Sequence, residues 1–156
     1  MPIATKAGMT VNDGMNPIVV TVGPGHTLRQ VAERMTAHNV GAAVVLDEES
    51  QAPGIITERD VLRSNGRGED IDTERVGDHL ASNVIYAYPD WPLETAAEKM
   101  IQGGFRHVIV LSPSGGAVAI LSMRDIVRCW TTATVPPEAE RARAHAPQPD
   151  ARPSAR

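Results

Sequence analysis

Apolar and polar stretches follow one another along the chain in an order that predicts the same five elements twice. In the first half, a short apolar run precedes Leu28, Val31, Ala32 and Met35, whose spacing puts them on one face of a helix. Two more short apolar runs, rich in β-branched residues, flank a polar turn, and a second helix starts at Thr57. The expected elements are a strand at 18–22, a helix at 27–39, strands at 40–46 and 54–56, and a helix from 57.

The second half repeats this order at a constant offset of 65 residues, the distance from Asp60 to Asp125. Laying residues 10–64 on residues 75–129 without a gap gives 15 identities in 55 positions. Unrelated sequences would match at about four of these positions. The equivalent elements are a strand at 84–88, a helix with Pro92 in its first turn, strands at 105–111 and 118–121, and a helix from 122.

The element order strand, helix, strand, strand, helix predicts a mixed α/β (α+β) fold. The two central strands of each copy should form an antiparallel hairpin, and both helices should cover one face of the sheet. The other face can be buried only against the second copy, so the repeats should pack sheet to sheet. The expected division is an N-terminal segment at 1–9, repeats at 10–64 and 75–130, a polar linker at 65–74, and a Pro/Ala-rich disordered tail at 131–156.

Composition narrows the classes of function. The net charge is −4 and the sequence pI is about 5.7, which argues against a general nucleic-acid binder. Cys129 is the single cysteine, so neither an internal disulfide nor a thiolate zinc cluster is expected, and the five histidines show no metal-ligand spacing. There is no apolar run of membrane-spanning length and no secretory signal, so we expect a cytoplasmic protein without membrane association. We find no nucleophile–base pair, and therefore expect no enzyme.

The closing segment of each copy resembles the cystathionine β-synthase (CBS) domain family. Residues 54–60 read GIITERD and residues 119–125 read AILSMRD, the second with Ala for the usual Gly. The run VGAAVVLD at 40–47 resembles the family's VGALPVVD strand, and FRHVIV at 105–110 resembles its FRHLPVV strand, each without the proline. The resemblance covers about residues 8–130. It implies two β-α-β-β-α repeats related by a pseudo-two-fold axis, as in the family's tandem pairs.

The closing motif has the chemistry of a ribose clamp. An ionised aspartate can accept hydrogen bonds from both ribose hydroxyls, and the start of a helix favours an anion. The resemblance implies two pockets between the repeats, each combining the clamp of one repeat with the walls of the other. One would use Ser122, Arg124 and Asp125 with Ile18, Val40 and Gly41; the other would use Thr57, Arg59 and Asp60 with Asn83, Phe105 and Arg106.

Two differences between the pockets stand out in the sequence. Arg106 can join Arg59, which favours phosphate in the second pocket, whereas Asn83 replaces an apolar wall residue there. The alternative is that Thr57 to Asp60 and Ser122 to Asp125 are helix capping boxes only.

The sequence therefore leaves two functions open. The first is a stand-alone regulatory module that senses AMP, ADP, ATP or S-adenosylmethionine, with no obligatory cofactor and no metal. The second is a ligand-free interaction or dimerisation module that regulates an unidentified partner protein. In either case we expect a homodimer, because Val61, Leu62, Ile126 and Val127 add apolar groups to the closing helices.

Overall fold

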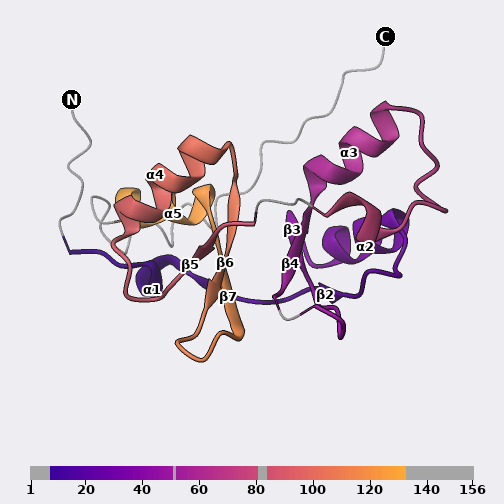
Figure 1. The fold of residues 1–156 in the computed structure, drawn as a ribbon. Coiled ribbons are helices and arrows are strands. Elements are labelled where there is room, and N and C mark those ends of the chain that lie inside the picture. The colour runs from indigo at the N-terminus through magenta and orange to yellow at the C-terminus, as the bar shows by residue number, and fades with distance from the viewer. Residues whose placement is uncertain (1–7, 51, 81–83, 133–156) are drawn as a thin grey trace, which may run out of the picture.

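The computed structural model describes residues 8–50, 52–80 and 84–132, and over these ranges both halves have the predicted order of elements (Figure 1). The first half consists of β2 (Thr21–Val22), α2 (Leu28–Ala37), β3 (Ala42–Val45), β4 (Gly54–Thr57) and α3 (Glu58–Gly66). The second half consists of β5 (Tyr86–Ala87), α4 (Leu93–Gly103), β6 (His107–Leu111), β7 (Ala117–Ser122) and α5 (Met123–Thr132). Most of the predicted N-terminal segment and most of the predicted tail lie outside the described residues.

Each half contributes one sheet, and the two sheets pack against each other. Within the described residues, the strand orders are β2-β3-β4 and β1-β7-β6-β5, where β1 is Asn16–Pro17. Both predicted hairpins are antiparallel, with Val44 opposite Ile55 in one and Ile109 opposite Ile120 in the other. The apolar cluster between the sheets contains Ala42, Val44, Ile55, Ile109 and Leu111. The predicted mixed α/β class and sheet-to-sheet packing are therefore confirmed.

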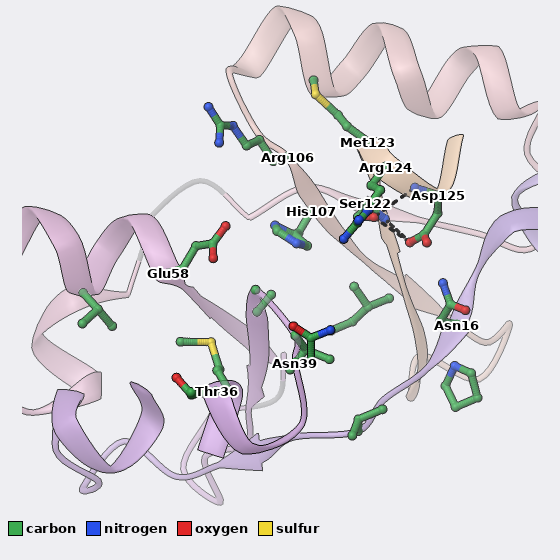
Figure 2. Close-up of a pocket in the computed structure, with 18 of the residues that line it drawn as sticks. Asn16, Thr36, Asn39, Glu58, Arg106, His107, Ser122, Met123, Arg124 and Asp125 are labelled. Carbon is green, nitrogen blue, oxygen red and sulfur yellow. Dashed lines mark hydrogen bonds between the residues drawn. The ribbon is translucent and has the colours of Figure 1, made fainter. Parts of the chain in front are cut away.

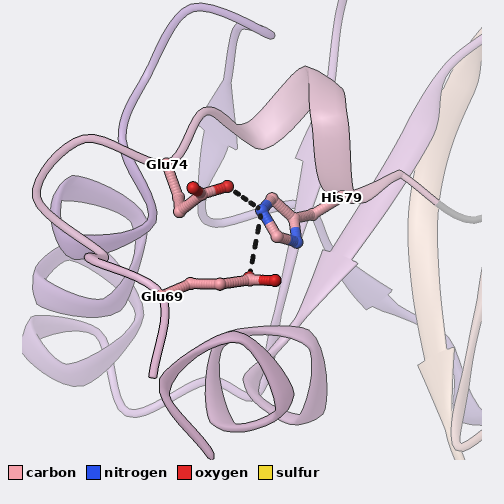
Figure 3. A group of neighbouring side chains, drawn as sticks. All are labelled: Glu69, Glu74 and His79. Carbon is pink, nitrogen blue, oxygen red and sulfur yellow. Dashed lines mark hydrogen bonds and ion pairs between the residues drawn. The ribbon is translucent and has the colours of Figure 1, made fainter. Parts of the chain in front are cut away.

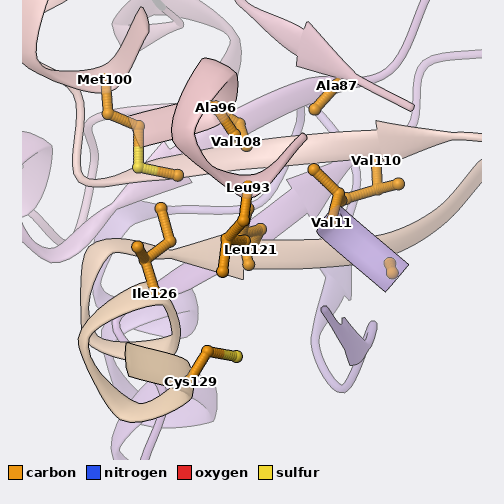
Figure 4. Packing of buried hydrophobic residues seen from close by; sticks show 11 residues of the cluster. Val11, Ala87, Leu93, Ala96, Met100, Val108, Val110, Leu121, Ile126 and Cys129 are labelled. Atoms are coloured by element: carbon orange, nitrogen blue, oxygen red, sulfur yellow. The ribbon is translucent and has the colours of Figure 1, made fainter. Parts of the chain in front are cut away.

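The helices cover the outer faces of the sheets, α2 and α3 on one side of the molecule and α4 and α5 on the other (Figure 1). In α2, Leu28, Val31 and Met35 are buried against β3 and β4, as the helical spacing predicts. The corresponding cluster of the second half is shown in Figure 4, with Leu93 and Met100 of α4 packed against the sheet. Burial of these side chains supplies the main stabilisation of each half.

The helices α2 and α4 begin in different ways. Thr27 caps α2: its hydroxyl accepts from the Gln30 backbone N–H at 3.2 Å, and its own N–H donates to the Gln30 side chain at 2.9 Å. Pro92, predicted in the first turn of α4, lies instead at the N-cap, with extended backbone angles. A proline fits this position because the N-cap N–H is not needed in the helix.

The segments leading into the two repeats are exchanged between the halves. The short helix α1 (Val11–Gly14) contacts α4 and α5, and β1 pairs with β7, so both pack on the second half. The 3₁₀ helix η1 (Val76–His79) packs on the first half in the equivalent way. The Val11 N–H donates to the Trp91 carbonyl, and the Val76 N–H donates to the His26 carbonyl, both at 2.9 Å. The segment that precedes the first half in the chain therefore packs on the second half, and the segment that precedes the second half packs on the first.

The first strand of each repeat is shorter than predicted. Only Thr21–Val22 of the expected strand at 18–22 pairs, in parallel, with β3. The chain crosses from one sheet to the other just before this point, since Pro17 pairs with Ala119 of β7. Ile18 lies at the crossing and packs against the cluster between the sheets.

The four apolar residues proposed for a dimer face divide into two pairs. Ile126 is buried in the second half, and Val61 is half-buried, where it packs against the core of the first half and lines a cavity between the halves. Leu62 and Val127, which occupy equivalent positions 65 residues apart, are 69% and 55% exposed. The prediction that Ile126 points outward is wrong, because α5 turns that position toward the sheet, and Val61 is only partly exposed.

Candidate functional site

A cavity of about 840 Å³ lies between the two halves, where the start of α5 faces α2 and β3 (Figure 2). Its walls combine the closing motif of the second repeat with the strand entry of the first, as predicted. The predicted residues that line it are Val40, Gly41, Ser122, Arg124 and Asp125. Ile18, predicted as a wall residue, does not line it, because its side chain fills the space between the sheets.

Asp125 lines this cavity and also takes part in the hydrogen bonds that cap the start of α5. The Ser122 N–H and hydroxyl donate to Asp125 Oδ2 at 2.9 and 2.7 Å, and the Asp125 N–H donates back to the Ser122 hydroxyl at 3.1 Å. The other oxygen, Oδ1, lies 3.4 Å from an Arg128 guanidinium nitrogen. Capping thus occupies one carboxylate oxygen and leaves the second at the cavity wall, so the capping and clamping interpretations do not exclude each other.

A second cavity of about 200 Å³ lies at the equivalent place beside the start of α3. The predicted residues that line it are Thr57, Arg59, Asp60, Phe105 and Arg106. The Thr57 N–H and hydroxyl donate to Asp60 Oδ2 at 2.8 and 2.9 Å, which repeats the arrangement at Ser122. Asn83, the sixth predicted residue of this pocket, lies outside the described residues.

The walls account for the difference in volume between the cavities. Where the first cavity has Val40 and Gly41, the second has Phe105 and Arg106 at equivalent positions. The Phe105 ring packs tightly on Gly103: a Cβ atom added there would lie 2.3 Å from ring atom Cε2. Larger side chains on the same backbone therefore leave less space in the second cavity.

Three residues line both cavities and form a shared wall: Glu58, Arg106 and His107. Burial lowers the pKa of His107 below its ordinary value; Glu58 and Asp125 raise that pKa, and Arg106 lowers it. The imidazole is therefore neutral at pH 7. The resemblance assigned Arg106 to the second pocket alone and included neither His107 nor Glu58, whose place in the closing motif carries no signal of its own.

Comparison with known proteins agrees with this architecture. A family model described as the CBS domain matches residues 10–66 and 76–131. An uncharacterized 17.7 kDa protein of Acidianus ambivalens is 34% identical over 110 residues, covering 70% of this chain and 66% of the relative. A Methanopyrus kandleri relative is covered over 57% of its length, so the chain spans less than two thirds of these curated relatives.

Two solved structures share the fold. The CBS domain protein PAE2072 from Pyrobaculum aerophilum, solved with AMP, is 27% identical with a TM-score of 0.69, over 80% of this chain and 99% of that one. The CBS domain pair of protein MJ0100, solved with 5′-methylthioadenosine and S-adenosyl-L-methionine, is 23% identical with a TM-score of 0.72, over 81% and 98%. In the described part of this chain, no helix has the length and apolarity to cross a membrane. The two matches to the family model cover most of the chain, which therefore belongs to the CBS domain family, as a tandem pair.

Proposed function

We propose that this CBS pair is a regulatory module, not an enzyme, and that it binds an adenosine-containing ligand in the first cavity. The observation that carries the proposal is the cavity beside Asp125, whose volume of about 840 Å³ falls within the range typical of small-molecule sites. The second cavity, at about 200 Å³, falls below that range. The complex of the Pyrobaculum relative with AMP supports the choice of ligand class.

The roles of the residues follow from their chemistry. Asp125 Oδ1 would accept hydrogen bonds from the ribose hydroxyls, with Ser122 holding the carboxylate in place. Val40 and Ala42 would form the apolar wall for adenine, beside Gly41, which has no side chain to occupy the cavity. The ligand would then lie between the two halves and contact both of them.

Charge favours a ligand with few phosphates. Among the described lining residues, Arg106, Arg124 and Arg128 contribute three positive charges, and Glu58 and Asp125 contribute two negative ones. The surplus of one positive charge suits a monophosphate better than a triphosphate, whose additional charge Glu58 would repel. We therefore propose AMP ahead of ADP and ATP; S-adenosylmethionine is the alternative adenosine compound.

Isothermal titration calorimetry of the full chain with AMP, ADP, ATP, S-adenosylmethionine and GMP tests the proposal. We expect saturable binding of AMP, weaker binding of ATP and none of GMP. If none of the adenosine compounds binds at millimolar concentration, the module has no such ligand.

The second candidate function is assembly with another protein chain. The observation in its favour is that Leu62 and Val127 expose apolar side chains at equivalent positions of the two closing helices. Light scattering should give a dimer for the wild type and a monomer for Leu62→Glu with Val127→Glu; a wild-type monomer would remove this candidate. The regulated partner and a cytoplasmic location stay predictions.

A further inference from the structure

The linker between the repeats and the helix η1 after it bring together three metal-ligating side chains, none of which lines either cavity. Glu69, Glu74 and His79 bring one carboxylate oxygen each and an imidazole nitrogen together, with all three atoms within 4.8 Å of one another (Figure 3). His79 Nε2 lies 2.7 Å from Glu74 Oε2 and 3.9 Å from Glu69 Oε2. The imidazole is only 11% exposed.

Several contacts hold this group in place. The Ser64 hydroxyl, fully buried in α3, donates to Glu69 Oε2 at 2.6 Å, and the Glu69 N–H donates to the Ser64 carbonyl at 3.2 Å. The Glu74 N–H donates to the Asp70 carbonyl at 2.9 Å, which closes a turn that sets the two glutamates on either side of His79. Backbone hydrogen bonds and α3 therefore hold the two carboxylates in position. In known metal sites, ligating carboxylates are likewise held by hydrogen bonds from the surrounding protein.

The fold itself does not require polar groups here. The positions equivalent to Glu74, His79 and Ser64 in the other half are Met9, Gly14 and Cys129. There Gly14 packs against Cys129, within an apolar cluster that Met9 also contacts. The same exchanged architecture is thus stable without carboxylates or imidazole, so the trio is an addition particular to one half.

Within the trio, a hydrogen bond joins only His79 and Glu74. A neutral imidazole has at most one proton on Nε2, and the 2.7 Å contact with Glu74 uses it. Glu69 Oε2, which accepts from Ser64, lies 3.9 Å from the imidazole nitrogen, beyond hydrogen-bond range, and within 4.8 Å of the Glu74 carboxylate oxygen. Arg67 offsets part of this charge from 3.7 Å, on the other oxygen of Glu69. A divalent cation would engage all three inward-facing atoms at once.

We propose that Glu69, Glu74 and His79 form a site for a divalent transition-metal ion, with Zn²⁺ as the best match. One imidazole nitrogen and two carboxylate oxygens are ligands that zinc accepts, with water completing the coordination. Ligand atoms of a tetrahedral zinc ion lie about 3.4 Å apart, between the 2.7 and 3.9 Å found here, so small side-chain rotations suffice. The ion would tie the linker to α3, and the site would be structural.

Calorimetric titration of the full chain with zinc chloride tests the site. We expect one ion per chain at about micromolar affinity or tighter, and a weakening of at least about ten-fold in His79→Ala. Glu74→Gln keeps the size of the side chain and should weaken binding in the same direction, so it decides the matter if His79→Ala does not fold. His38→Ala, which removes an exposed histidine at the C-cap of α2, is the matched control and should bind as the wild type does.

The spectrum of the Co²⁺-loaded protein gives a second readout. Binding at the trio should produce visible absorption bands that Glu74→Gln changes and His38→Ala leaves unchanged. Absence of zinc binding by the wild type, or zinc affinity equal in the wild type and Glu74→Gln, would show that the trio is only a hydrogen-bonded cluster.

Discussion

The two cavities are built from equivalent parts of the two repeats, yet only one has the volume of a small-molecule site. Each has a hydroxyl residue and an aspartate at the start of a closing helix, joined by nearly identical hydrogen bonds. The walls differ: Val40 and Gly41 in the first cavity correspond to Phe105 and Arg106 in the second. The hydroxyl–aspartate pair is the same in both repeats because it also caps a helix that each repeat needs. The wall residues have no such second role, so they can differ between the repeats.

The aspartates themselves differ in their surroundings. Asp125 is 8% exposed and has Arg128 beside its second oxygen, whereas Asp60 is half-buried. Hydrogen bonds to a charged group are stronger where water is excluded. The first cavity is therefore favoured by its clamp as well as by its volume.

The largest expected effect comes from giving the first cavity the wall of the second. Gly41→Arg places at position 41 the residue found at the equivalent position 106, next to Glu58, which lies 3.2 Å from where a Cβ atom would stand. The new side chain should occupy the cavity and weaken AMP binding by about a hundred-fold or more, since it displaces the ligand from the wall. Calorimetry measures this; unchanged affinity would mean that AMP binds elsewhere.

The reciprocal change should open the second cavity. Phe105→Val replaces the ring that packs on Gly103 with the side chain found at position 40, and should raise the AMP stoichiometry from one toward two per chain. The matched variant Val40→Phe should narrow the first cavity and weaken its binding. A stoichiometry that stays at one in Phe105→Val would show that the wall residues do not decide which cavity is used.

A smaller effect is expected from the shared wall as pH changes. His107 has a pKa lowered mainly by burial, with Glu58 and Asp125 opposing and Arg106 reinforcing the shift. In the unfolded chain the imidazole titrates near 6.5, so below that pH the unfolded state binds more protons than the folded state. The folded state should therefore lose stability as pH falls from about 6.5 toward the lowered pKa.

Urea denaturation at several pH values between 7.5 and 5 measures this loss. The free energy of unfolding should fall less steeply in His107→Gln than in the wild type, whereas the control His38→Gln should follow the wild type. Parallel curves for His107→Gln and the wild type would contradict a lowered pKa.

Much of the fold could be predicted because each repeat checks the other. The hairpins and helix starts depend on local spacing, and the same spacing occurs at Thr57 and at Ser122. The exchange of the lead-in segments could not be predicted, because it depends on contacts such as that from Val11 to Trp91, between residues about 80 positions apart. Because the lead-in segment packs on the other half, the first strand pairs with β3 only at Thr21–Val22. For the same reason the Ile18 side chain packs in the core between the two sheets.

The candidate site divides in the same way. Ser122 and Asp125 belong to a motif that is read along the chain, and they line the first cavity as the resemblance implied. Glu58 and His107 reach both cavities only because two sheets from different repeats meet there. Residue type alone gave no reason to connect these two side chains, which lie 49 positions apart in the sequence.

The most direct test of the account is an AMP titration of two matched variants, Asp125→Asn and Asp60→Asn. Asparagine keeps the size of the side chain and part of the helix cap, so both variants should fold. We expect Asp125→Asn to bind AMP roughly ten- to a hundred-fold more weakly than the wild type, the loss of a charge-assisted hydrogen bond, and Asp60→Asn to bind it with wild-type affinity. Equal affinities in all three proteins, or a loss confined to Asp60→Asn, would contradict binding in the first cavity.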